Sequence, residues 1–235
     1  MAVSTPKLVL LVFAALAALC GVAFAASELL RHVSDRTTML SQHVDRVLVH
    51  ADAGDVHLVA GRADRVSITE HRTWLWDEPK VRTSIRDGIL EVSGDCPSTR
   101  LPDRCSIDFT LAVPFDVDVG IDGGAGDIGI DGLAGHIDLR TGAGNVSGRD
   151  LHPVEVRART DAGDVDLQFG TRPVSVAGVS HAGDISIAVP GGEYRVDTTT
   201  RAGNIDVEGL LRNDRALRSI SAHTDAGDVT VHGAG

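Results

Sequence analysis

The feature that most constrains this chain is a short phrase, Ala-Gly-Asp or Ala-Gly-Asn followed by Ile or Val, which recurs along much of its 235 residues. From Gly126 onward the glycines of successive copies lie 18, 19, 20, 20 and 24 residues apart, and an outlying copy precedes them. Self-similarity of this kind is typical of repeat architectures. The expected turn residues are Gly54, Asp55, Gly126, Asp127, Gly144, Asn145, Gly163, Asp164, Gly183, Asp184, Gly203, Asn204, Gly227 and Asp228.

Each copy of the phrase is followed by a strict alternation of apolar and polar residues. Val165, Leu167 and Phe169 would face one side of an extended segment, with Asp166 and Gln168 on the other. This alternation predicts half-buried strands. Gly tolerates the positive φ that a sharp reversal needs, and the following Asp or Asn can hydrogen-bond the local backbone. The repeat unit is therefore a strand, a tight turn, a second strand and a looser turn.

A unit of about twenty residues cannot bury its apolar face alone, but it can do so by stacking on the next unit at ~4.8 Å. Aromatic residues make up only 3% of the chain, which suits a thin core filled by Val, Ile and Leu. We therefore expect an all-β fold, a single-chain β-solenoid of ~20-residue coils. The alternative is a β-sandwich built from hairpins.

The expected solenoid has two parts. Residues 121–235 form the regular repeat coils, and residues 44–120 form a more irregular N-terminal β part that caps the stack. The final coil, from Val229 to Val231, is followed by only four residues. We therefore expect it to leave an unpaired strand edge at the end of the stack.

The N-terminal residues 1–30 contain an apolar run from Leu8 to Ala26. As a helix, these residues would span roughly 28 Å, close to the ~30 Å of a bilayer core. They predict a single-pass membrane anchor with an extracytoplasmic C-terminal domain. The alternative is a signal peptide that ends at Ala25, since Ala23-Phe24-Ala25 has the small-x-small pattern of a cleavage site, and a secreted protein. A linker is expected over 31–43.

Two cysteines of the body, Cys96 and Cys105, flank a short loop that contains proline. A single close pair of this kind in an exported chain predicts a disulfide.

The charge and the missing motifs exclude several functions. The formal net charge is −11, which is the wrong sign for a nucleic-acid partner. The acids are regularly spaced and no nucleophile, phosphate-loop or His/Cys metal motif occurs, so we expect no enzyme activity, cofactor or metal site. A calcium ladder along the Asp and Asn turns is the alternative, although Ile128 stands where the calcium-binding repeat needs Asp.

Trp74 and Trp76 are the candidate contact residues. Separated by Leu75, they would point to the same face of a strand. They either plug the end of the core or form a stacking platform for a carbohydrate or protein partner.

As a whole, the pattern resembles the bacterial putative-adhesin β-strand-repeat family, a β-solenoid-like domain of unknown function. The matching features are the first strands from Val47 to Val59, the pair Cys96 and Cys105, the dipeptide Val113-Pro114, and the coils from Gly126 to Val231.

This resemblance implies a cell-envelope protein and provides no catalytic residues. The expected function is a non-enzymatic surface protein, an adhesin-like scaffold or binding module, with an unknown protein or glycan partner and the membrane contacted through the N-terminal segment. The alternative is a sensor or accessory subunit that docks on a membrane signalling partner through the free strand edge.

Overall fold

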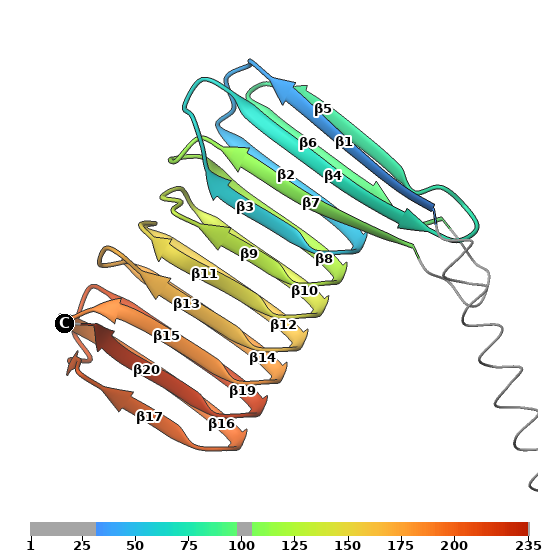
Figure 1. Ribbon diagram of the computed structural model, residues 1–235. Helices are drawn as coiled ribbons and strands as arrows, with labels where there is room; N and C mark the ends of the chain where they lie inside the picture. The colour runs from blue at the N-terminus through green and yellow to red at the C-terminus, as the bar shows by residue number, and fades with distance from the viewer. Residues whose placement is uncertain (1–31, 98–104, 235) are drawn as a thin grey trace, which may run out of the picture.

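The computed structural model describes residues 32–97 and 105–234, and these residues form strands and turns but no helix (Figure 1). The all-β prediction is confirmed. In the described part of the chain no helix is long and apolar enough to cross a bilayer. The anchor or signal segment expected over 1–30 lies outside the described residues.

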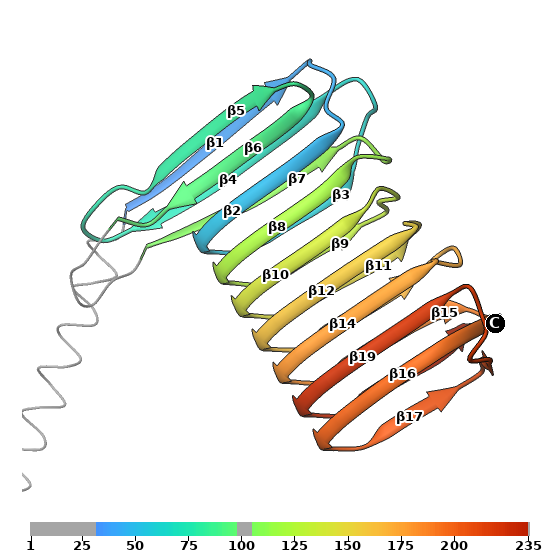
Figure 2. The same ribbon diagram turned by 180° about the vertical axis from the view of Figure 1, so that it is seen from behind.

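The strands form two ten-stranded sheets that lie face to face (Figures 1 and 2). In spatial order, sheet A consists of β1 (His32–Leu40), β4 (Val66–Trp74), β7 (Ser106–Val113), β3 (Val56–Ala60), β9 (Ile128–Asp131), β11 (Val146–Leu151), β13 (Val165–Phe169), β15 (Ile185–Pro190), β20 (Val229–Ala234) and β17 (Ile205–Glu208). Sheet B consists of β5 (Lys80–Arg86), β6 (Ile89–Asp95), β2 (Arg46–Ala53), β8 (Asp118–Ala125), β10 (Ile137–Ala143), β12 (Glu155–Ala162), β14 (Ser175–Ala182), β19 (Ser219–Ala226), β16 (Glu193–Ala202) and β18 (Leu211–Arg212).

In the repeat region, each unit contributes one strand to each sheet. The chain runs along sheet B, reverses at an Ala-Gly-Asp or Ala-Gly-Asn corner, and returns along sheet A. Each strand then pairs in parallel with the equivalent strand of another repeat, so that Ala143 is opposite Ala162 and Val146 is opposite Val165. The ladders described from β8 onward are all parallel, whereas hairpin pairing would be antiparallel.

The repeats are not stacked in chain order at the C-terminal end. Strands β19 and β20 lie between the preceding units, with β14 and β15 on one side and β16 and β17 on the other (Figures 1 and 2). The expectation that the coil at Val229 to Val231 leaves the free edge is therefore wrong. The strands at the open end are instead β16 and β17, with β18 pairing only with the first residues of β16.

The N-terminal part shares both sheets with the repeats. Strands β2 and β3 pair directly with β8 and β9, so the outlying Gly54 corner is the immediate neighbour of the Gly126 corner. Most of the linker expected over 31–43 is instead strand β1, which pairs antiparallel with β4 along its whole length. Its sequence mixes polar and apolar residues without a turn signal, which suits a strand at the edge of a sheet.

The predicted disulfide is present. It joins Cys96 after β6 to Cys105 before β7, with the two Cα atoms 5.8 Å apart. It therefore links the end of a sheet B strand to the start of a sheet A strand.

A single aliphatic core runs between the sheets. It consists mostly of inward Val, Ile and Leu side chains, and its largest fully buried residues are Tyr194 and Phe109. At roughly 25 cal/mol per Å² of buried apolar surface, these side chains provide the main stabilisation of the fold.

Candidate binding groove

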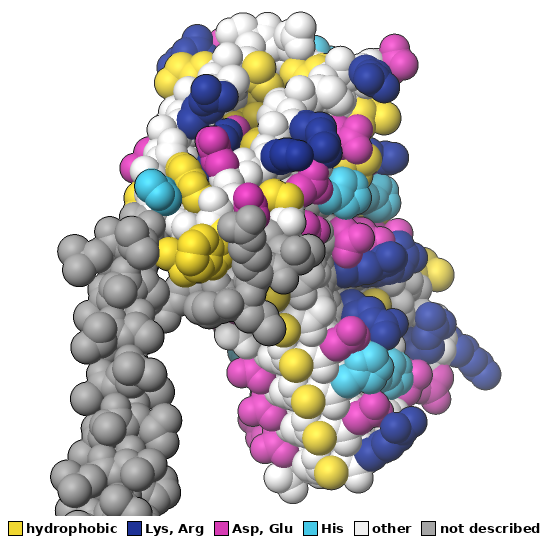
Figure 3. Space-filling model, turned by 90° about the vertical axis from the view of Figure 1, so that its right-hand side faces the viewer, with side chains coloured by type: hydrophobic (Ala, Val, Ile, Leu, Met, Phe, Trp, Pro, Cys, Tyr) yellow, Lys and Arg dark blue, Asp and Glu magenta, His cyan; other side chains and the backbone are white. Residues whose placement is uncertain are grey.

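The predicted turn residues lie over one another in a column along one edge of the molecule. The alanines of the corner phrases pair across every neighbouring repeat, for example Ala125 with Ala143 and Ala182 with Ala226. All of them except the half-buried Ala53 are exposed, and a file of single hydrophobic side chains is visible along this edge in Figure 3. The alignment of corners that the repeat predicts is therefore present.

The corner glycines are required for two reasons, which Gly163 illustrates. Its φ is 145°, and a Cβ at this position would lie 2.1 Å from the carbonyl oxygen of Gly144 in the neighbouring corner. The first fact disfavours any L side chain, and the second leaves no room for one.

The Asp and Asn residues form a continuous ladder between the corners. The Oδ1 atom of Asp127 accepts the backbone N–H of Asn145 at 2.7 Å, and Oδ1 of Asn145 accepts the N–H of Asp164 at 2.8 Å. The same contact joins every corner from Asp55 to Asn204, in spatial order. We expected these side chains to hydrogen-bond their own turn, but they bind the next corner instead.

A second ladder, made of hydroxyl groups, was not predicted. Thr160 Oγ1 donates to the carbonyl of Gly144 at 2.8 Å, and Thr141, Ser180, Thr200 and Thr224 donate in the same way to the neighbouring corner glycine. The signal was present in the sequence, since each of these hydroxyl residues stands two positions before the Ala of the phrase.

The two tryptophans do not share a strand face. Strand β4 ends at Trp74, whose half-buried ring stacks on His32 with 5.5 Å between the ring centroids. Trp76 follows the strand and is 47% exposed, while Leu75 between them is buried. Neither indole belongs to the core, so the predicted plug is wrong. A contact role for this pair remains a prediction.

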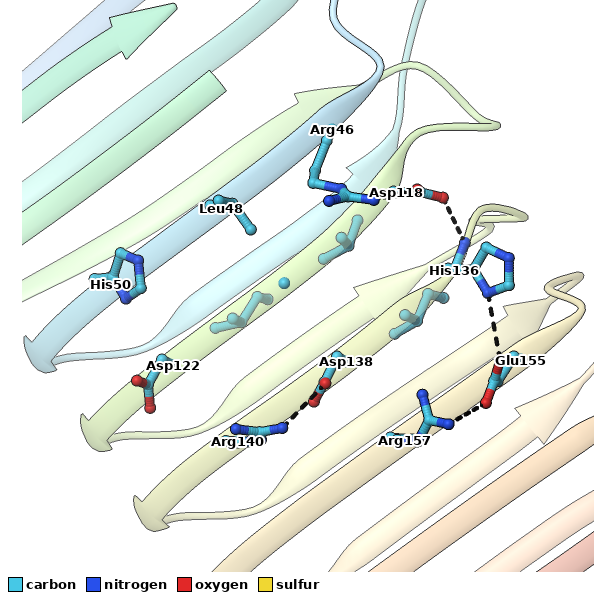
Figure 4. A pocket seen from close by; sticks show the side chains of 14 residues that line it. Arg46, Leu48, His50, Asp118, Asp122, His136, Asp138, Arg140, Glu155 and Arg157 are labelled. Atoms are coloured by element: carbon cyan, nitrogen blue, oxygen red, sulfur yellow. Dashed lines mark hydrogen bonds and ion pairs between the residues drawn. The ribbon is translucent and has the colours of Figure 1, made fainter. Parts of the chain in front are cut away.

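A groove lies on the outer face of sheet B, over β2, β8, β10 and β12 (Figure 4). Its volume is about 380 Å³. At its centre lies Gly120, with Leu48 on one side and Asp138 on the other. Because Gly120 has no side chain in this outward row, the surface is hollowed at that point.

Charged pairs of both signs surround this hollow (Figure 4). Arg46 Nη2 lies 3.1 Å from Asp118 Oδ2, and Arg140 Nη2 lies 3.2 Å from Asp138 Oδ2. On β12, Arg157 Nη2 lies 2.5 Å from Glu155 Oε1.

Two histidines complete the lining. His136 Nδ1 lies 3.7 Å from Glu155 Oε2, and its backbone N–H donates to Asp118 Oδ1 at 2.9 Å. His50 is on β2, beside Asp122 on β8. The groove therefore presents three arginines, four carboxylates and two imidazoles at its surface.

The side chain of Asp118 accepts hydrogen bonds from Arg46 and from the backbone N–H of His136. Burial alone would raise the pKa of Asp118, but the backbone N–H of His136 and the guanidinium of Arg46 together lower it below its usual 3.8. The group is thus ionised near neutral pH and acts as a hydrogen-bond acceptor.

The groove was not found from the sequence. Its lining residues stand at alternate, outward positions of four strands, and they converge only once the parallel register is known. Among the described residues, no group of three or more His, Cys, Asp or Glu side chains is placed to hold a metal ion. The arrangement offers paired donors and acceptors for a ligand.

Structural comparison identifies proteins with a similar architecture. A putative cell adhesion protein from Clostridium sporogenes aligns with a TM-score of 0.55 and 10% identity over 86% of this chain and 100% of that one. A putative adhesin from Bacteroides fragilis gives a TM-score of 0.45 and 15% identity over 86% and 97% of the two chains. A putative lipid binding protein from Parabacteroides distasonis gives 0.34 and 11% over 87% and 97%. No family model and no curated protein matches the sequence.

The first of these alignments shows a common fold. It confirms, at the level of the fold, the resemblance to the bacterial putative-adhesin strand-repeat family.

Proposed function

We propose that this chain is a non-enzymatic binding scaffold of the cell envelope, and that its outer-face groove holds a neutral, hydroxyl-rich ligand, a glycan. In this proposal the body is a β-solenoid, and the N-terminal segment anchors or exports it. The observation on which the proposal depends is the hollow over Gly120, which is bordered by ion pairs on neighbouring strands of one sheet.

The chemistry of the groove suits a sugar better than an ion. Three arginines nearly balance four carboxylates, so neither a strongly acidic nor a strongly basic ligand is favoured. Guanidinium donors beside carboxylate acceptors can hydrogen-bond vicinal hydroxyl groups in both directions. Leu48 adds apolar surface for the C–H face of a sugar ring.

The scaffold supports such a site because it is pre-formed. The groove residues project from four adjacent strands that are held in register by parallel ladders, so little conformational entropy is lost when a ligand binds. The regular coil-on-coil pairing of the repeats supports the solenoid description. The shared fold with a protein described as a putative cell adhesion protein agrees with a surface role.

The alternative function, a sensor or accessory subunit, needs a free edge at the C-terminal coil. That coil is paired on both sides, so it offers no free edge for such a partner.

The experiment that tests the proposal fills the hollow without disturbing the core. In Gly120→Val, a Cβ would meet only Cδ2 of Leu48, at 2.8 Å, and this is the end of a flexible side chain. The full chain in detergent is tested against an array of neutral oligosaccharides, and the sugars that bind are then titrated by calorimetry. We expect Gly120→Val to weaken binding at least about tenfold, which is 1.4 kcal/mol.

The matched control is Ala177→Val, which lies in the same outward row on β14, beyond the groove. It should bind as the unchanged chain does. The proposal is abandoned if no oligosaccharide binds, or if both variants bind equally well.

A further inference from the structure

We propose that the open end of the stack pairs with the same end of a second copy, which gives a dimer with twofold symmetry. The surface concerned, the terminal rung, consists of β16 and β17. It is separate from the groove, so the inference does not depend on glycan binding.

The terminal rung has the properties of an edge that lacks a partner. In the described residues, β17 pairs only with β20, and the part of β16 from Arg195 to Ala202 pairs only with β19. Each strand therefore has a row of backbone N–H and C=O groups on its outer side, which can pair with another strand.

Apolar side chains at this end are incompletely covered. Ile205, at the position where other repeats place a fully buried Ile or Val, is 46% exposed, and Leu211 is 67% exposed. Val196 and Val207 are only partly buried against the core. A partner that continues the stack would bury Ile205, Val196 and Val207, which are in register with buried residues of the neighbouring repeat.

The shape of the end fits a second copy. Strands β16 and β17 run in opposite directions because the corner at Gly203 reverses the chain between the sheets (Figure 2). If a second copy is turned by 180° about an axis parallel to the strands, β17 of the second copy lies beside β16 of the first. In the same way, β16 of the second copy lies beside β17 of the first. Both contacts are then antiparallel, and both sheets continue at once. A single peptide strand from another protein could satisfy only one of the two edges.

The charges agree with this symmetry. Arg201 and Asp206 are both exposed. Along the chain they are at equal distances on either side of the corner, whose centre lies between Gly203 and Asn204. The rotation therefore brings Arg201 of each copy beside Asp206 of the other. Within one copy, Arg201 pairs with Asp225 at 3.0 Å, on the side away from the edge.

The other end of the stack is protected against the same contact. Its sheet B edge is β5, with Lys80, Arg82 and Arg86. Under the same rotation β5 would face β1 of the second copy, and basic residues on an edge strand are a common device against edge pairing. The asymmetry favours a closed dimer over a filament.

The test measures the mass of the full chain in detergent by sedimentation, with the detergent density-matched. We expect a dimer of the 24.6 kDa chain. Ile205→Arg should give a monomer, whereas Val174→Arg, a substitution at an equally exposed valine just before β14, which β19 separates from β16, should remain a dimer. Circular dichroism melting confirms that both variants are folded.

Charge reversal then identifies the geometry. Arg201→Asp and Asp206→Arg should each weaken the dimer about tenfold or more, and the double variant should recover affinity. A monomer at all concentrations, a head-to-tail polymer, a dimer that Ile205→Arg does not affect, or charge-reversal losses that simply add in the double variant would each overturn the proposal.

Discussion

At the scale of single residues, the corner works as one continuous hydrogen-bonded unit. Its glycine allows close approach, its Asp or Asn binds the next backbone N–H, and a hydroxyl two residues before the Ala binds the neighbouring glycine carbonyl. The exposed corner carboxylates thus have a structural task, which explains why Asn can replace Asp at Asn145 and Asn204. The sequence predicts the glycine and the Asp or Asn of each corner, because these residue types are restricted, but it does not predict that the Asp or Asn binds the next corner. The hydroxyl was overlooked because Thr is also a common strand residue.

Thr160→Val tests the hydroxyl ladder. Valine has nearly the same shape as threonine, so packing is kept while the hydrogen bond to Gly144 is lost. Because Thr160 is fully buried, we expect a loss of about 1–3 kcal/mol in the free energy of unfolding, measured by denaturant titration. The same change at the exposed Thr110 should cost less than about 0.5 kcal/mol. Equal, small effects at both sites would show that the ladder does not stabilise the fold.

The lowered pKa of Asp118 predicts a pH dependence. A carboxylate whose pKa is lower in the folded than in the unfolded state stabilises the fold above the unfolded value of 3.8, and this stabilisation disappears as the pH falls through the folded value. Asp118→Asn should therefore lower Tm at about pH 7, and the difference from the unchanged chain should shrink towards about pH 2.5. A difference in Tm that is the same at both pH values would contradict this.

At the scale of elements, strand positions follow from the alternation of apolar and polar residues, but strand order does not. The phrase at Gly227 is as regular as the phrase at Gly203, so nothing local says which of the two lies at the end. In the structure, β19 and β20 lie between the pair β14 and β15 and the pair β16 and β17. The longer interval between Gly203 and Gly227 contains the connection from β17 to β19. The exposure of Ile205, beside the full burial of Val229, is the result of that order.

Hydrogen exchange tests this order. Amides of β19 and β20 are bordered by strands on both sides, whereas β16 and β17 have a free edge. Peptides covering 219–234 should therefore exchange more slowly than peptides covering 193–208, measured by mass spectrometry on the full chain under conditions that keep any dimer dissociated. Faster exchange at 219–234 would mean that the repeats stack in chain order.

At the scale of the whole molecule, the sequence predicts the strand-repeat architecture but not the position of the groove. Periodicity, glycine corners and the Cys96–Cys105 pair are local signals, and each is found where it was expected. The groove depends on residues from β2 and β12 that are more than a hundred positions apart in the sequence. It forms only because the parallel strand pairing of sheet B brings these strands together. Trp74 and Trp76, the contact residues that the sequence suggests, are not among the residues that line the groove.

Chemical-shift mapping by NMR on the full chain in detergent, titrated with a neutral oligosaccharide that binds it, tests whether the groove is the binding site. We expect shifts confined to amides and arginine side chains around Gly120 on β2, β8, β10 and β12. Shifts centred instead on Trp74 and Trp76, or on the terminal rung, would show that the groove is not the binding site.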